Sequence, residues 1–475
     1  MKRLAKSATL ITLSFLIMLP PVSHATNGYF LIGYGAKSRG MGGVGVAYAQ
    51  DALAAAANPA GIAFVGSRVD AGLEFFNPPR RVGGGATDPV NFPTEFQFRA
   101  DTESGSNEFL IPSMGMVYKF NRKISLGFAA VGNGANTRFD ADDNFFSLTD
   151  NTDPNAPPII APAGVISWGT LGVNLLQMQM LLSSSYKVNK QHVIGASLVG
   201  AVQQFRGYGL GNFGGIFNFS SDVNNLTNRG NDWSYGCCIK LGWVVTFLDK
   251  RLQLGTSYSS RVYMTEFEKY RGLFAEQGDF DIPENYSIGL SYKFTPKLTV
   301  AFDYQRINYS DIASIGNTHP TTSLNDLCTR PISNPNPCST PGAVPQPTSR
   351  ALGEDDGFGF GWEDMNVFKL GVNYALNDKW ELRAGWNYGE SPVPDSQLLF
   401  SMIAPAIIEH HGTLGLTYKP NKKMEWNANY THGFENSQVC AVNDGCLSMV
   451  TQRPGNFIAA EMEIRALGIA FAYKL

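Results

Sequence analysis

The residues whose types and spacing could carry chemistry form three short motifs. Gly40, Gly42 and Gly45 have the spacing of a dinucleotide-binding loop, but no buried strand precedes them and no βαβ unit follows. Residues 140–144 begin like a calcium-binding loop, yet the glycine of its sixth position and the glutamate of its twelfth are missing. Residues 409–411, Glu-His-His, have no evident third metal ligand or nucleophile, and the Gly-x-Ser-x-Gly motif does not occur. The sequence therefore predicts a protein that is not an enzyme and that binds no cofactor or metal ion.

The six cysteines indicate an oxidising compartment rather than a metal site. None of them has the spacing of zinc ligands. Two adjacent cysteines point to opposite faces of a predicted strand, and we expect them to be free thiols: Cys237 and Cys238. Two further pairs close short rings, and we predict that both are disulfides: Cys328 with Cys338, and Cys440 with Cys446.

The first 25 residues have the parts of a secretory signal peptide. Three basic residues lie in the first six positions, residues 8–19 are apolar, and Ser23 and Ala25 are small residues before a cleavage point. The apolar stretch is too short for a membrane-spanning helix, which needs ~20 residues. We therefore predict that the chain is exported and exclude residues 1–25 from the fold.

The composition of the remaining chain fits one large all-β unit. Hydrophobic residues make up 44% of the sequence, which also has 50 Gly, 31 Phe, 19 Tyr and 7 Trp. We find no linker and no alternation of strands with helices, so a set of smaller soluble domains fits less well. The formal net charge of −3 becomes −6 without the three basic residues of the signal, and nucleic acid is therefore not an expected partner.

From about residue 68 onward, apolar and polar residues alternate with period two. A strand of a membrane barrel presents apolar side chains to lipid and polar or small ones to the lumen, which produces this pattern. A strand of a soluble sandwich also alternates, with its apolar face toward the core, so alternation alone does not choose between the two folds. The clearest examples are residues 286–294, 298–305, 368–374, 380–388 and 424–432.

Strand ends and connections favour the membrane barrel. Aromatic residues such as Tyr118, Phe294 and Tyr473 lie at strand ends, as in the interfacial girdle of a barrel. Connections alternate between turns of about three residues and much longer loops, which is the asymmetry of outer-membrane barrels. The predicted strands are fourteen, an even number, and they begin near residues 68, 109, 123, 175, 191, 233, 251, 282, 297, 363, 379, 405, 423 and 457.

The segment between the signal and the first strand, residues 26–67, is predicted to plug the barrel. A fourteen-stranded barrel is wider than the eight-stranded barrels that their own side chains fill, so something must occupy or gate its lumen. Residues 49–57 look helical, and glycines near residue 40 would allow close packing against the wall. We therefore predict an all-β fold with three parts: signal peptide 1–25, mostly helical plug 26–67, and fourteen-stranded antiparallel transmembrane β-barrel 68–475.

The plug segment resembles the hatch of the FadL family of outer-membrane long-chain fatty-acid and hydrocarbon transporters. The resemblance rests on Asn27-Gly28-Tyr29-Phe30, Gly40-Met41-Gly42-Gly43 and Asn58-Pro59-Ala60-Gly61, and the fourteen strands match it too. It implies a monomeric barrel in the bacterial outer membrane, surrounded by lipid and lipopolysaccharide. It also implies that outer loops capture an apolar substrate, which passes to an internal pocket and leaves sideways into the bilayer.

One irregularity in the third predicted strand could provide the sideways exit. Gly132, Asn133 and Gly134 follow a regular strand over residues 124–131, and glycines inside a strand commonly mark a bulge or bend. The resemblance implies an inward kink of the third strand that opens a gap in the wall at this point. The alternative is that the strand simply ends there.

The outer loops supply apolar surface for capture, and a fatty acid also needs a cation for its carboxylate. The candidate capture residues are Ile159, Ile160, Trp168, Leu171, Phe213 and Phe217. The resemblance implies a basic residue near the outer end of the fifth strand, where Arg206 is the first candidate. Four other basic residues occupy strand positions that face the lumen, and we expect them to pair with carboxylates such as Asp303 and Glu381. These residues are Arg261, Lys293, Lys369 and Arg383.

These features together predict an outer-membrane transporter of hydrophobic compounds, with long-chain fatty acids as the first candidate substrate. Neutral aromatic or alkane hydrocarbons are the alternative, because they would use the same route without a cation for a carboxylate. A general diffusion porin is a further alternative, against which the plug argues. An outer-membrane enzyme is disfavoured because the sequence has no nucleophile motif.

Overall fold

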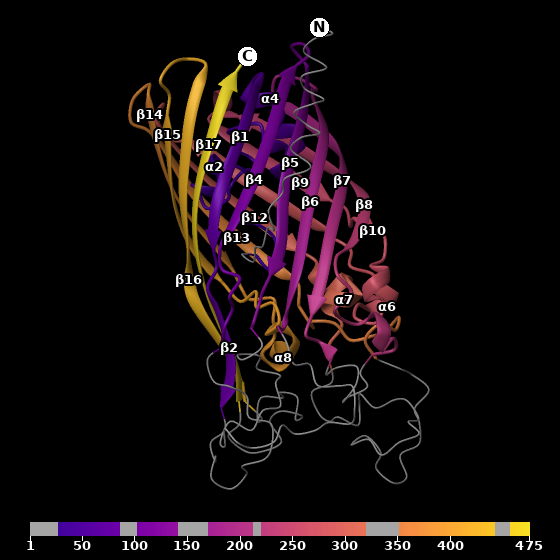
Figure 1. Cartoon of the computed structure of the whole chain (residues 1–475). Helices are drawn as coiled ribbons and strands as arrows, with labels where there is room; N and C mark the ends of the chain where they lie inside the picture. The colour runs from indigo at the N-terminus through magenta and orange to yellow at the C-terminus, as the bar shows by residue number, and fades with distance from the viewer. Residues whose placement is uncertain (1–26, 86–101, 141–169, 212–219, 320–350, 442–456) are drawn as a thin grey trace, which may run out of the picture.

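The computed structural model describes residues 27–85, 102–140, 170–211, 220–319, 351–441 and 457–475. In these residues fourteen long strands pair in antiparallel order, and the last pairs with the first, so the sheet closes into a barrel (Figure 1). The fold class predicted from the sequence is thus confirmed. The barrel strands are β1 (Arg68–Asn77), β4 (Phe109–Lys119), β5 (Ile124–Asn136), β6 (Gly172–Lys187), β7 (His192–Tyr208), β8 (Asp232–Phe247), β9 (Leu252–Ser259), β11 (Asn285–Lys293), β12 (Leu298–Ile307), β13 (Met365–Ala375), β14 (Trp380–Gly389), β15 (His410–Tyr418), β16 (Met424–Ala441) and β17 (Phe457–Lys474).

Three short strands and several short helices lie outside this regular ladder. Strands β2 and β3 continue the sheet at the end of the barrel away from the C-terminus, and β10 pairs with β8 (Figure 1). Apart from η4, which forms the turn between β8 and β9, these elements belong to the connections at the other end of the barrel. Their bounds are β2 (Arg80–Gly85), β3 (Thr102–Glu103), β10 (Tyr263–Met264), η3 (Val223–Asn225), η4 (Leu248–Lys250), η5 (Glu268–Tyr270), α6 (Ala275–Gly278), η6 (Tyr309–Asp311), α7 (Ala313–Gly316), η8 (Asp395–Gln397) and α8 (Leu398–Ser401).

The predicted strand starts agree with the structure to within three residues at every strand except β15. That strand begins at His410 rather than near residue 405. The apolar residues before it are buried instead of paired, among them Ile403, Ile407 and Ile408. An apolar run that looked like the start of a strand therefore folds inward, because the lumen offers it an apolar core.

The two faces of each strand differ as a membrane barrel requires. Phe302 and Leu370 are exposed on the outside, at 41% and 49%, whereas the charged Asp303 and Lys369 beside them in sequence are buried. Apolar side chains thus point outward, which is the reverse of a soluble sandwich. Within the described residues, no helix has the length and apolar character needed to cross a membrane.

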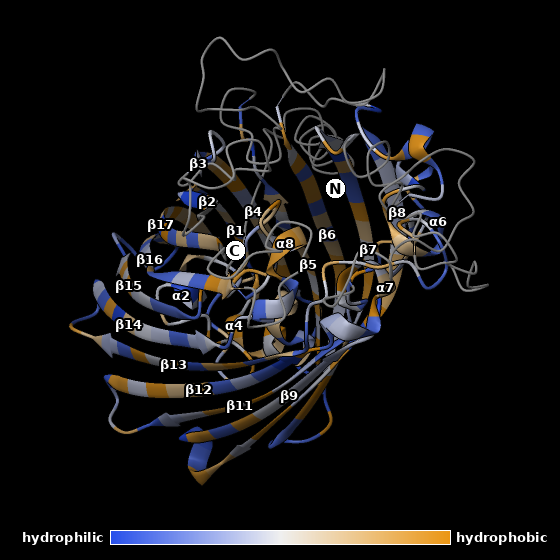
Figure 2. Cartoon of the chain, turned by 90° about the horizontal axis from the view of Figure 1, so that it is seen from below, coloured by the Kyte–Doolittle hydropathy of each residue, from blue (hydrophilic) through white to orange (hydrophobic). Residues whose placement is uncertain are grey.

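The N-terminal segment lies inside the barrel, and we call residues 27–67 the hatch (Figure 2). It contains α2 (Ala36–Arg39), α3 (Ala54–Ala57), η1 (Pro59–Gly61) and α4 (Ile62–Val65). The helix expected over residues 49–57 is shorter than predicted. The backbone N–H of Ala52 donates to Asp70 of β1 at 3.0 Å. The wall, rather than a preceding helical turn, thus supplies the hydrogen-bond acceptor for this N–H group.

Glycines of the wall allow the hatch to pack against the strands. At eight wall glycines a Cβ atom would approach a hatch atom to 3.0 Å or less, closer than real side chains pack. Hatch glycines match them: Gly40 lies against Gly415, and Gly42 lies against Gly385 with a φ of 69° that favours glycine. The wall glycines are Gly115, Gly195, Gly242, Gly255, Gly289, Gly371, Gly385 and Gly415.

Candidate functional site

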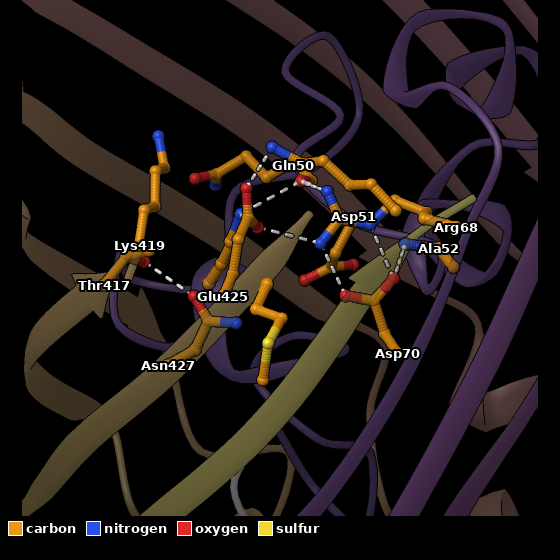
Figure 3. Close-up of polar contacts among 12 residues, drawn as sticks. Gln50, Asp51, Ala52, Arg68, Asp70, Thr417, Lys419, Glu425 and Asn427 are labelled. Atoms are coloured by element: carbon orange, nitrogen blue, oxygen red, sulfur yellow. Dashed lines mark hydrogen bonds and ion pairs between the residues drawn. The ribbon is translucent and has the colours of Figure 1, made fainter. Parts of the chain in front are cut away.

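Buried ion pairs fasten the hatch to the wall near the end of the barrel that holds the C-terminus. Lys37 of α2 lies 2.6 Å from Glu425 of β16, and Arg39 pairs with Glu74 of β1. Arg68 lies between Asp70 and Glu425, at 2.6 and 3.0 Å, beside Gln50 and Asp51 of the hatch (Figure 3). Because removing one partner of a buried pair costs about 3–5 kcal/mol, these contacts hold the hatch firmly in place.

Asp51 of the hatch is the exception in this charged cluster. Burial raises the pKa of Asp51 to about 6, and the neighbouring Asp70 carboxylate adds to the rise, while Arg68 and Lys37 oppose it. A carboxyl group whose pKa is raised by folding binds its proton more tightly in the folded protein than in the unfolded chain. Ionisation of Asp51 therefore lowers stability progressively as the pH rises from its ordinary pKa of 3.8 to about 6, and the full cost is present above about pH 6.

We expect Asp51→Asn to raise the Tm at pH 7.5 and to change it much less at pH 4, close to the ordinary pKa of an aspartate. Asparagine removes the charge but keeps the side-chain oxygen that accepts a hydrogen bond from the Leu53 N–H at 3.0 Å. Thermal unfolding of the purified protein at the two pH values measures the effect, with the exposed turn variant Asp249→Asn as control. A variant Tm at or below that of the wild type at pH 7.5 would contradict this account.

The wall has a gap between β4 and β5. Ladder pairs between these strands run only from Lys119–Ser125 to Met114–Ala130. Beyond that point residues 109–113 still pair with β1, and residues 131–136 still pair with β6, but the two edges do not pair with each other. The predicted third strand thus continues past Gly132, Asn133 and Gly134 and leaves its neighbour there.

Residues on both edges explain why the ladder stops. Pro112 of β4 has no N–H to donate, and Gly134 of β5 has a φ of 155°, which side chains disfavour. Asn133 turns inward: its Oδ1 accepts from the Leu31 N–H of the hatch at 3.4 Å, and its Nδ2 donates to Gln177 at 3.2 Å. The unpaired part of β5 is therefore held from inside the barrel by the side chain of Asn133.

The gap has an outer boundary. Beyond it the Gly105 N–H donates to the Arg138 carbonyl at 2.7 Å, and the Arg138 N–H donates to Ser104 Oγ at 3.1 Å. A break in the ladder that is closed at both ends is a window in the wall. We call the segment between Met114–Ala130 and Gly105–Arg138 the wall window.

An apolar pocket lies inside the barrel next to the wall window. It is narrow, with a volume of about 40 Å³, and six of its twelve lining residues are aromatic. Ala135 of β5 lines the pocket and also belongs to the unpaired edge of the window. The lining residues are Tyr29, Ala135, Val173, Leu175, Phe205, Phe274, Phe280, Ile315, Phe360, Trp362, Ala404 and Ala406.

The structure places Arg206 away from this pocket. Its side chain is exposed on the outer face of β7, where the guanidinium lies 5.6 Å from the Tyr208 ring centroid. The preceding residue, Phe205, is buried and lines the pocket. Neighbouring residues of a strand face opposite sides of the sheet. The prediction that Arg206 faces the pocket is therefore wrong, because the side chain that does so belongs to Phe205.

The other predicted lumen cations have different partners. Arg383 pairs with Glu381 at 2.6 Å, and Arg261 pairs with Asp279 and Asp281. Lys369 donates to the Ile32 carbonyl at 2.8 Å, while Asp303 accepts from the N–H groups of Gly45 and Val46 at 2.7 and 2.9 Å. Both groups thus bind hatch backbone rather than each other. Lys293 is exposed at the end of β11.

The remaining predicted residues are only partly described. Asn58 is buried, and its Oδ1 accepts from the Ala60 N–H at 3.0 Å next to Pro59, which fixes the turn of the hatch. Leu171 is buried and pairs with Phe139 instead of forming an outer capture surface. Cys440 is disulfide-bonded, and Cys237 and Cys238 are free. Eight predicted residues lie outside the described ranges: Ile159, Ile160, Trp168, Phe213, Phe217, Cys328, Cys338 and Cys446, the expected partner of Cys440.

Sequence reasoning missed the residues of the pocket, although a signal was present. Lumen positions of most strands are polar or small, whereas Val173, Leu175 and Phe205 are apolar at lumen positions of β6 and β7. Apolar residues on the wrong face of a barrel strand indicate a place where the lumen itself is apolar. The aromatic residues from outer segments, such as Phe274 and Trp362, have no such periodic signal.

A closed barrel with an internal hatch, an apolar pocket and a window in its wall defines an outer-membrane transport protein for hydrophobic compounds. The chain belongs to the OmpP1/FadL/TodX family: the model of this family of outer-membrane transport proteins matches residues 169–475. Because this family and its barrel fold belong to the bacterial outer membrane, this protein is located there as well. No curated protein sequence matches the chain.

Solved structures share the fold over nearly the whole chain. The chain is similar to the Pseudomonas putida toluene transporter TodX, with 17% identity, a TM-score of 0.61, and 94% of this chain and 99% of that chain covered. The Ralstonia pickettii toluene transporter TbuX has 16% identity and a TM-score of 0.57 with the same coverage. A Pseudomonas aeruginosa FadL homologue has 14% identity and a TM-score of 0.58, again with the same coverage.

Proposed function

We propose that this protein takes up long-chain fatty acids by passing them from the internal pocket through the wall window into the membrane. The proposal rests on the position of Ala135, because this residue both lines the apolar pocket and belongs to the unpaired edge of β5. A fatty acyl chain gains about 0.8 kcal/mol for each CH₂ group removed from water. A route that runs from an apolar pocket into lipid therefore suits this substrate better than a water-filled channel does.

Neutral aromatic hydrocarbons are the second candidate substrate. The twelve residues that line the pocket include no charged side chain, and half of them are aromatic. Such a lining suits a flat apolar molecule that needs no ionic partner. A general porin is disfavoured because the hatch packs against eight strands of the wall and occupies the lumen.

Uptake of labelled oleate tests the proposal and separates the candidates. Cells that lack their own outer-membrane fatty-acid transporter are compared with and without this protein, and excess toluene serves as competitor. We expect restored oleate uptake that toluene does not reduce. Absence of oleate uptake in cells that carry the folded barrel would refute the fatty-acid proposal, and toluene uptake in the same cells would support the second candidate.

A further inference from the structure

Arg80, the first residue of β2, has a buried guanidinium group with unused hydrogen-bond donors. The residue is 1% exposed, and its Nη1 donates to the Asn136 carbonyl at 2.6 Å. Its Nε and Nη2 atoms are buried without a hydrogen-bond partner. An arginine side chain has five N–H donors, so most of the donors of Arg80 are left unused.

The other buried arginines of the described chain have carboxylate partners. Arg39 pairs with Glu74, and Arg68 and Arg383 pair with Asp70 and Glu381. Among the described residues, no Asp or Glu forms an ion pair with Arg80. A buried charge without a partner costs several kcal/mol of desolvation free energy. The fold therefore bears at Arg80 the desolvation cost of an unpaired buried charge, which the carboxylate partners offset at the other three buried arginines.

The unused donors of Arg80 have the geometry of a carboxylate site. Nε and Nη2 lie along one edge of the planar guanidinium group, and their N–H bonds point in the same direction. Two parallel N–H bonds match the two oxygens of a carboxylate and form a bidentate, charge-assisted pair. Nη1, on the other edge, is the atom that binds the protein.

Arg80 lies at the outer end of the wall window. Its hydrogen-bond partner Asn136 is the last residue of β5 and follows Ala135, which lines the apolar pocket. The unpaired edges of the window bury three apolar side chains, from Phe109, Ile111 and Val131. A cation thus stands at one end of a buried apolar surface, which is the arrangement that an amphiphile with an anionic head requires.

We propose that Arg80 binds the carboxylate of a fatty acid and places its acyl chain along the apolar edge residues of the wall window. This inference rests on the proposed function and assigns the substrate class of that same route. The head group completes the hydrogen bonds of Nε and Nη2, and the acyl chain contacts Phe109, Ile111 and Val131. A neutral hydrocarbon would leave the guanidinium without a partner, so the site selects acids over hydrocarbons.

Binding of dodecanoate and 1-dodecanol to the full chain in phosphatidylcholine nanodiscs tests the assignment. The two probes share a chain length and differ in charge, and empty nanodiscs measure the background from partitioning. We expect Arg80→Met to weaken dodecanoate binding at least tenfold and to leave 1-dodecanol binding unchanged. Arg80→Lys should retain part of the dodecanoate affinity, because lysine keeps the positive charge but lacks the two parallel N–H donors of the guanidinium group.

Arg81→Met is the matched control, because Arg81 is the next residue and lies half exposed, 3.8 Å from Glu103. We expect its binding of both probes to equal that of the wild type. Arg80→Met that binds dodecanoate as tightly as the wild type would overturn the assignment and leave the proposed function standing. A wild-type protein that binds neither probe above background would instead refute the proposed function.

Thermal unfolding separates ligand binding from a structural role of Arg80. Removing an uncompensated buried charge should leave the Tm of Arg80→Met equal to that of the wild type or higher. A lower Tm together with equal loss of both probes would identify Arg80 as a brace that holds β5, and would overturn the proposal.

Discussion

Replacing Gly132 and Gly134 together with valine should produce a folded barrel whose uptake of hydrophobic substrate falls more than tenfold. Gly134 has a φ of 155°, which a β-branched residue does not adopt without strain. Valine instead favours regular strand geometry, in which β5 would continue its ladder with β4 beyond Met114–Ala130. The wall window would then be closed by backbone hydrogen bonds.

Uptake of labelled oleate by cells that carry the variant measures this effect, and heat-dependent electrophoretic mobility reports whether the barrel is folded. Gly200→Val is the control, because Gly200 lies in β7 and a Cβ atom there would have no other atom within 4 Å. We expect the control to transport like the wild type. Unchanged uptake by the folded Gly132→Val, Gly134→Val double variant would disprove the lateral route.

Gly385→Val should displace the hatch and convert the closed barrel into an open pore. A Cβ atom at Gly385 would collide with the backbone of Met41 and Gly42, which cannot move aside as a flexible side chain could. The change would also break the hydrogen bond from the Gly42 N–H to Thr413 Oγ1, which measures 2.8 Å. Overpacking of this kind costs about 1–3 kcal/mol, and here the cost falls on the contact between hatch and wall.

Single-channel recording in planar bilayers checks the prediction for Gly385. We expect no steady ionic current through the wild type and a steady current through the variant. Gly412→Val, in the neighbouring strand β15, is the control, because its Cβ atom would lie 3.4 Å from the Phe434 ring on the outer face, an ordinary contact distance. A variant that folds and still passes no current would show that the hatch adapts to the added side chain.

The two variants examine different parts of one transport route. The wall window controls the exit toward lipid, and the contact between hatch and wall controls leakage through the lumen. Asn133 connects them, because its side chain lies on β5 and accepts a hydrogen bond from Leu31 of the hatch. We therefore expect the Gly385 variant to alter hydrophobic uptake as well as conductance, whereas the double variant should alter uptake alone.

The amino-acid sequence by itself determined the barrel, its strand number and its plug. Alternation of period two and short turns are local features, so thirteen of fourteen strand starts could be placed to within three residues. Gly132 and Gly134 lie in the part of β5 that does not pair with β4, and glycine inside a strand is a local signal of such an irregularity. The failure at β15 came from apolar residues such as Ile407, whose burial depends on a lumen that no local pattern describes.

Only the tertiary structure decided which side chains meet inside the barrel. Arg206 was placed on the wrong face because a shift of one residue reverses the direction of a side chain on a strand. The wall window depends on where the pairing of β4 with β5 stops, and the pocket joins residues from distant segments such as Tyr29 and Trp362. The isolation of Arg80 from every described carboxylate is likewise a property of the closed barrel, since it depends on the three-dimensional positions of residues far apart in the chain.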